Sequence, residues 1–142
     1  MADTRVDLTG PRAICEAVRS GGAAIFKWEW DDRFNAVLSP FRRRDSSKAR
    51  SLLERSLGRG WRTDSIGAAA PVVLRVADAF DGLRPGQELF VSAPGPAVGT
   101  CAAWWPWGDG ETISVRIALV TESVPGREQP ALVSELRSWF AV

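Results

Sequence analysis

The sequence predicts an α+β domain, with an antiparallel sheet of about five strands (two hairpins plus one strand) covered by three to four helices, mostly on one face. Segments with apolar residues at helical spacing are followed by segments that alternate with period two. Turn signals favour hairpins, and no strand–helix–strand rhythm repeats. The 142 residues suffice for one core, so we expect a single globular domain over residues 1–142.

The helices are predicted from apolar stripes and their end signals. Asp45 or Ser46 can cap a helix that ends before Gly58. Pro71 suits the first turn of another helix, although the letters PVVL that begin there also suit a strand. We expect helices at residues 11–20, 46–57, 71–80 and 130–140.

The letters AAIFKWEWDDRFNAVLSPF predict the first hairpin, because they alternate with period two. A three-residue loop at 31–33 places Trp30 opposite Phe34 and Trp28 opposite Ala36, which makes one face wholly apolar. A two-residue loop would instead pair Trp28 with Asn35 and Lys27 with Ala36. We therefore expect the longer loop, with both tryptophans in the core.

Further strands are expected in the second half of the chain. The letters ELFVS predict a strand at residues 88–92, and the proline- and glycine-rich residues 93–99 predict a loop. Residues 59–69 are irregular or contain a short strand around Trp61.

The second hairpin is predicted from the dipeptide Asp109–Gly110, a strong signal for a two-residue turn. Counted back from this turn, Trp104 lies opposite Val115. The face that we assign to the core collects Ala102, Trp104, Pro106, Ile113, Val115, Ile117 and Leu119.

The other face of this hairpin carries an aromatic strip bordered by polar groups, with Trp105, Trp107 and Arg116. Because Pro106 cannot donate to a strand ladder, we expect its strand at an edge of the sheet. Two interpretations stay open: the strip contacts a partner, or a helix such as 130–140 covers it.

A basic segment lies at residues 41–62, where eight Lys or Arg residues and two acidic residues make a local net charge of +6, against +1 for the whole chain. Such a segment can bind phosphates or another anion, or it can be a solvated helix flank. The candidate anion-binding residues are Arg42, Arg43, Arg44, Lys48, Arg55, Arg59 and Arg62.

The sequence lacks the residues that several kinds of catalytic and metal chemistry require. The chain has no histidine and no tyrosine, so it lacks the commonest general base and the commonest transition-metal ligand. Phosphate-binding glycine loops are missing, and the carboxylate pairs sit at turns, where acidic residues are expected. We therefore expect no catalytic residues, no metal and no cofactor.

The location of the protein is predicted from what the chain lacks. Apolar runs are too short to span a membrane, so we expect no membrane insertion, and the first residues do not follow the pattern of a signal peptide. Cys15 and Cys101 suit buried, reduced thiols. The expected location is the cytoplasm.

Three functional hypotheses follow. The first is a non-enzymatic interaction module, of adaptor, dedicated-chaperone or inhibitor type, that binds a protein through Trp105, Trp107 and Arg116 at the aromatic sheet edge. The alternative is a single-stranded nucleic-acid-binding protein that uses tryptophan stacking and the basic segment 41–62. A third is a tryptophan-lined pocket for a small ligand such as a sugar. Self-association into a homo-oligomer stays open.

Overall fold

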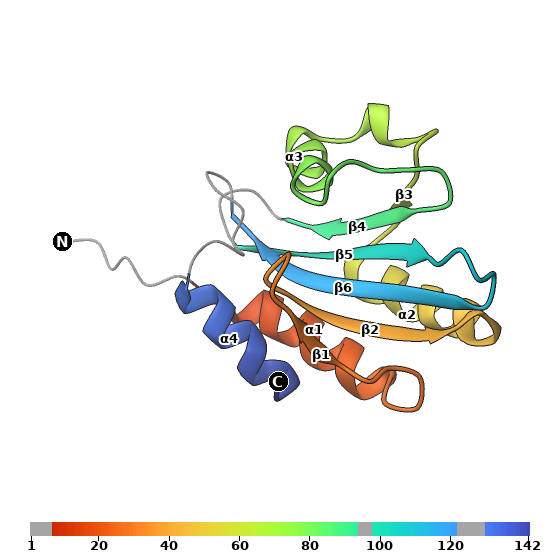
Figure 1. Ribbon diagram of the computed structural model, residues 1–142. Helices are drawn as coiled ribbons and strands as arrows, with labels where there is room; N and C mark the ends of the chain where they lie inside the picture. Colours follow the sequence, from red (N-terminus) through yellow and green to blue (C-terminus); the bar gives the residue numbers. More distant parts are fainter. Residues whose placement is uncertain (1–6, 94–97, 122–129) are drawn as a thin grey trace.

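The computed structural model describes residues 7–93, 98–121 and 130–142. Within these residues it confirms the predicted α+β class, with four α-helices and one antiparallel sheet (Figure 1). The sheet has six strands rather than about five, because residues 59–69, for which an irregular segment and a short strand were both open, contain the short strand at Trp61, and it joins the sheet. In chain order the elements are α1 (Thr9–Gly21), β1 (Glu29–Asp31), β2 (Ala36–Arg42), the 3₁₀ turn η1 (Arg43–Asp45), α2 (Ser46–Leu57), β3 (Gly60–Trp61), η2 (Ile66–Ala68), α3 (Pro71–Ala79), β4 (Glu88–Ser92), β5 (Gly99–Pro106), β6 (Thr112–Val120) and α4 (Pro130–Phe140).

The strands follow the order β1-β2-β6-β5-β4-β3, and all neighbours are antiparallel. Strand β5, which carries Trp104 and Trp105, therefore lies inside the sheet, and the prediction of an edge strand is wrong. Pro106 is tolerated because β4 begins at Glu88, opposite Trp104, and so does not reach it. The Trp107 N–H donates to the Thr112 carbonyl (2.8 Å), which directs the nitrogen of Pro106 away from β6, to the unpaired side.

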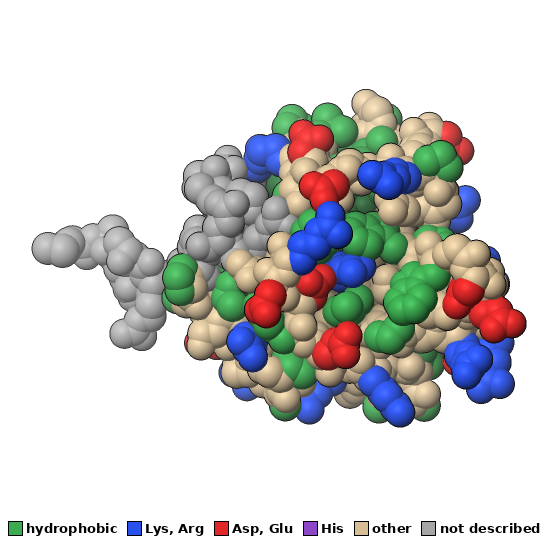
Figure 2. Space-filling model, viewed as in Figure 1, with side chains coloured by type: hydrophobic (Ala, Val, Ile, Leu, Met, Phe, Trp, Pro, Cys, Tyr) green, Lys and Arg blue, Asp and Glu red, His purple; other side chains and the backbone are tan. Residues whose placement is uncertain are grey.

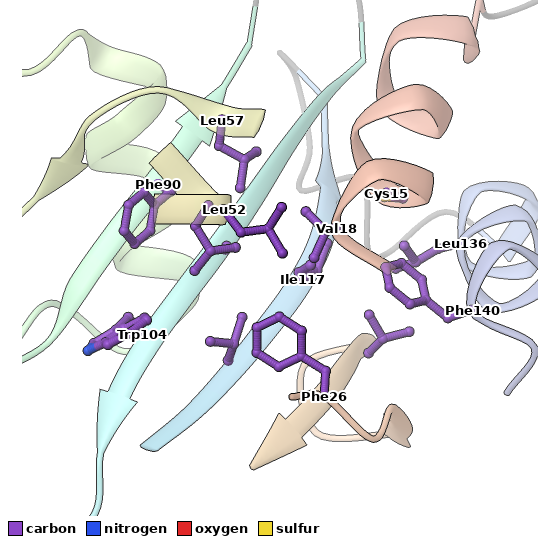
Figure 3. Close-up of a cluster of buried hydrophobic side chains, with 14 of the residues drawn as sticks. Cys15, Val18, Phe26, Leu52, Leu57, Phe90, Trp104, Ile117, Leu136 and Phe140 are labelled. Carbon is purple, nitrogen blue, oxygen red and sulfur yellow. The ribbon is translucent and has the colours of Figure 1, made fainter. Parts of the chain in front are cut away.

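Sheet side chains alternate between two hydrophobic clusters, one on each face. Helices α1, α2 and α4 cover the first cluster and α3 covers the second, which confirms helices mostly on one face. In β5, Ala102 and Trp104 belong to the first cluster, whereas Cys101 and Ala103 belong to the second. Figure 3 shows side chains of the three helices converging on the sheet in the first cluster.

The first hairpin has a different register from the one predicted. Asp31 belongs to β1, and the loop comprises the four residues 32–35 instead of three. The prediction assumed a single buried face, but each face of this sheet carries a buried hydrophobic cluster. Phe34 packs into the second cluster, while Trp28 and Trp30 are partly buried against the first.

The second hairpin has the predicted register, with Trp105 opposite Ser114. Trp104 is 2% exposed and lies in the first cluster, as predicted. Its ring contacts the ring of Phe41 edge to face, with centroids 5.3 Å apart. This tryptophan is therefore a core residue.

The helices begin and end close to the predicted residues. Helix α2 begins at Ser46 and ends before Gly58, which has a φ of 94° that favours glycine. Helix α3 begins at Pro71, so the strand alternative for this segment is wrong. Helix α1 is slightly longer than predicted, and α4 has the predicted bounds.

Two expectations concern other parts of the chain. The predicted loop 93–99 falls mainly on residues 94–97, outside the described residues. Where the structure does describe the chain, no helix is both long enough and apolar enough to cross a membrane.

Candidate functional site

The predicted aromatic strip lies on the sheet face that carries α3, beside the part that α3 covers. Leu38 and Pro40 of β2 also lie there and belong to neither hydrophobic cluster. Figure 2 shows hydrophobic side chains on this side of the molecule with acidic and basic ones among them. We name this surface the open face and define it by Asp31, Leu38, Pro40, Arg42, Trp105, Trp107, Thr112, Ser114 and Arg116, which strand pairing and alternation bring together.

The centre of the open face is an ion pair that rests on an indole ring. Arg116 Nε lies 2.6 Å from Asp31 Oδ2, and the two side chains are 16% and 11% exposed. The guanidinium carbon of Arg116 lies 4.3 Å from the ring centroid of Trp105, and its Nη1 donates to the Ser114 hydroxyl (3.3 Å). These contacts hold the guanidinium in one orientation on the sheet.

The two tryptophans of the strip differ in their surroundings. Trp105 is partly buried and makes edge contacts with Phe34 and Phe80, at centroid distances of 5.5 and 6.0 Å. Trp107 is 50% exposed. Helix α4, the example of a covering helix in one of the two interpretations, packs on the opposite sheet face, and Phe80, the residue after α3, contacts Trp105 instead. Trp107 is therefore the exposed aromatic side chain of the open face.

The turn that carries Trp107 is held from two directions. The Thr112 hydroxyl donates to Asp109 (2.7 Å), and this hydrogen bond lowers the pKa of the Asp109 carboxyl below its ordinary value. Arg43 Nε donates to the carbonyl of Gly110 (2.8 Å), which joins η1 to the turn. The position of Trp107 is thus supported by its own hairpin and by the chain after β2.

The first residues of the basic segment lie near the open face. Arg42 pairs with Thr112 across the strands and is exposed on the same face as Trp107. Arg43 is engaged at the turn described above, and Arg44 is exposed in η1.

The other basic residues point elsewhere. Lys48 and Arg55 line a groove between the end of α1 and α2, on the opposite side of the sheet. Arg59 stacks over the ring of Trp61 in the outermost strand β3, at 4.3 Å, and Arg62 pairs with a carboxylate of β4. The structure therefore divides the predicted basic segment among several surfaces.

Sequence reasoning missed Asp31, Leu38 and Pro40 as members of this surface. The predicted register placed Asp31 in the loop, where an acidic residue needs no further explanation. Period-two alternation in β2 could have put Leu38 and Pro40 on one face, but their neighbours depend on the pairing of β2 with β6.

The open face offers an oriented cation, a carboxylate, hydroxyl groups and two indoles, which suits binding by apolar burial and directed hydrogen bonds. Among the described residues, no group of three or more His, Cys, Asp or Glu side chains could hold a metal ion. No protein-family model, curated protein or solved structure matches this chain.

Proposed function

We propose that the protein is a non-enzymatic interaction module that binds a protein partner, of adaptor, dedicated-chaperone or inhibitor type, through its open face. The observation that best supports this proposal is that Trp107, which is half-exposed, lies on the same face as Leu38 and the oriented guanidinium of Arg116. The proposed binding residues are still Trp105, Trp107 and Arg116, but the surface that they form is a sheet face and not a sheet edge.

The chemistry of this surface favours protein binding. A tryptophan that enters a partner's pocket is a common interface hot spot, worth about 2 kcal/mol or more when truncated. Arg116 is already paired with Asp31 and stacked on Trp105, so little side-chain freedom is lost on binding. Apolar area at Leu38 and Pro40 adjoins these groups, which matches the mixed character of protein interfaces.

Nucleic-acid binding has weaker support. Stacked bases need a basic track beside the aromatic rings. Of the seven predicted anion-binding residues, Arg42 shares the face of Trp107, whereas Lys48, Arg55 and Arg62 lie around α2 and β3. We therefore propose a protein partner rather than a nucleic acid.

The expected cytoplasmic location is also part of this proposal. Cys15 and Cys101 are buried and not joined by a disulfide, and they belong to different clusters on opposite faces of the sheet. This arrangement suits a reducing compartment, where thiols are not oxidised to disulfides.

The test compares two truncated surface side chains, Trp107→Ala and Leu74→Ala. Trp107 and Leu74 are the large hydrophobic residues that are exposed in the described chain, at 50% and 41%, and Leu74 lies on α3, outside the open face. Tagged wild type and both variants are used to capture partners from the source cells, and a candidate partner is then purified and titrated calorimetrically.

We expect Trp107→Ala to weaken the purified complex by about 2 kcal/mol or more, and Leu74→Ala to change it by less than about 0.5 kcal/mol. Equal affinity of both variants would contradict the open face as the binding surface. Sedimentation of the protein alone tests whether the partner is a second copy. Salt-sensitive oligonucleotide binding that is lost in Arg42→Ala would favour the nucleic-acid alternative.

A further inference from the structure

A second polar site, centred on Glu88 of β4, lies on the sheet face that α1, α2 and α4 cover. This residue pairs with Trp104 across the strands and is 5% exposed. Arg50 of α2 donates from Nη1 to both of its carboxylate oxygens. Arg62, just after β3, holds its Nε 3.3 Å from Glu88 Oε1. A buried carboxylate thus brings together two arginines that are twelve residues apart in the sequence.

The two guanidinium groups border a cavity of about 340 Å³, which residues 63–64 and 86–87 complete. Its size is within the range of small-ligand sites, which run from about 300 to 1,000 Å³. The ring of Trp104 limits the movement of Arg50, because the guanidinium carbon of Arg50 lies 4.7 Å from the centroid of this ring. The cavity therefore has a positioned cationic wall.

Arg50 and Arg62 have more N–H donors than the described residues provide acceptors for. Glu88 engages Nη1 of Arg50 and Nε of Arg62. Among the described residues, Arg50 Nη2 and the two Nη atoms of Arg62 form no hydrogen bond or ion pair. Asp64 also lines the cavity, but it forms no ion pair with either arginine among these residues. The cavity is therefore bordered by two guanidinium groups, by the Glu88 carboxylate that pairs with both of them, and by the Asp64 carboxylate.

Gly60 of β3 leaves room for the carboxylate. A Cβ atom at this position would lie 3.0 Å from Glu88 Oε1 and 3.0 Å from two ring atoms of Phe90. The backbone of β3 therefore approaches Glu88 closely, and a side chain at position 60 would crowd the carboxylate that contacts both arginines.

We propose that this cavity binds a small oxyanion, either a phosphate or a carboxylate group, through the free donors of Arg50 and Arg62. Guanidinium groups bind both anions with paired, charge-assisted hydrogen bonds. Glu88 acts as a positioning residue that orients the arginines without touching the ligand. The site is separate from the open face, since Glu88 points to the α2 side of the sheet.

Arg62→Ala tests the site against the matched control Arg59→Ala. Both substitutions remove one positive charge from the same exposed segment, but Arg59 stacks on Trp61 and does not line the cavity. Inorganic phosphate and acetate are titrated separately into the full-length wild type and each variant by calorimetry at low salt, and thermal unfolding by circular dichroism confirms that the variants are folded.

We expect phosphate to bind the wild type, with affinity lowered about tenfold or more in Arg62→Ala and about twofold or less in Arg59→Ala. Acetate binding with the same dependence assigns the site to carboxylates, and phosphate binding alone assigns it to phosphates. Failure of both anions to bind, or equal losses in the two variants, would overturn the proposal.

Amide chemical shifts locate the bound anion independently. On addition of phosphate we expect the largest changes at Gly86 and Gln87 in the cavity wall. Changes confined to residues 42–44 would show that the anion binds elsewhere and would overturn the proposed site.

Discussion

Replacing Asp31 by alanine removes the anionic partner of Arg116 at the centre of the open face. The two groups are joined at 2.6 Å and their side chains are 11% and 16% exposed, so the remaining cation loses its partner in a largely buried position. Trp105 on one side of the guanidinium limits its escape to water. We therefore expect the substitution to destabilise the fold as well as the surface.

The magnitude follows from the attraction and the burial. Opposite unit charges about 4 Å apart attract by about 4 kcal/mol at an effective dielectric constant of about 20. Removing one member of a buried pair costs about 3–5 kcal/mol, because the other charge stays unpaired. Arg116 keeps some exposure and its hydrogen bond to Ser114, so we expect the lower end for Asp31→Ala, about 3 kcal/mol.

Urea unfolding followed by circular dichroism at pH 7 measures this loss. Arg116→Met and the double variant complete a mutant cycle, for which we expect a coupling energy of about 2 kcal/mol. The control is Arg33→Ala, because the ion pair of Arg33 with Asp81 is exposed (71% and 60%) and is expected to contribute less than about 1 kcal/mol. A loss below about 1 kcal/mol for Asp31→Ala, equal to that of the control, would refute the reasoning.

Two further predictions concern the core. Trp104→Ala should lower the free energy of unfolding by about 3–5 kcal/mol because its ring is 2% exposed, whereas Trp107→Ala should cost about 1 kcal/mol; similar losses in urea unfolding would contradict this contrast. Burial raises the pKa of the Cys15 thiol to about 12 from an ordinary value of 9.0. Because the folded state keeps the proton that the unfolded state loses, stability should fall as the pH rises from 9.0 toward 12, and Cys15→Ala should remove this part of the pH dependence in thermal unfolding.

Much of the secondary structure could be predicted because its signals are local. Pro71 and Gly58 mark a helix start and a helix end that depend on backbone geometry within a few residues. The Asp109–Gly110 turn specifies the pairing of β5 with β6 in the same way, so the faces of Trp104 and Trp105 were predicted correctly.

The first hairpin shows where this reasoning stops. Its register depends on which of its apolar residues are buried together, and a period-two pattern suggests one buried face. Phe34 is instead buried in the second cluster and Trp30 packs against the first, on the opposite face, because helices pack on both sides of the sheet. Without that information, the three-residue loop is the better expectation from sequence and still the wrong one.

By itself, the sequence determined the helices, the second hairpin, the core position of Trp104 and the aromatic strip with Arg116, since all of these depend on residues close along the chain. The tertiary structure alone decided that β5 lies inside the sheet and that Asp31 reaches Arg116. It also separated the basic residues of segment 41–62 and joined Arg50 to Glu88. The physical reason is that strand order and helix placement follow from burying both sheet faces at once, a requirement of the whole chain that no local pattern expresses.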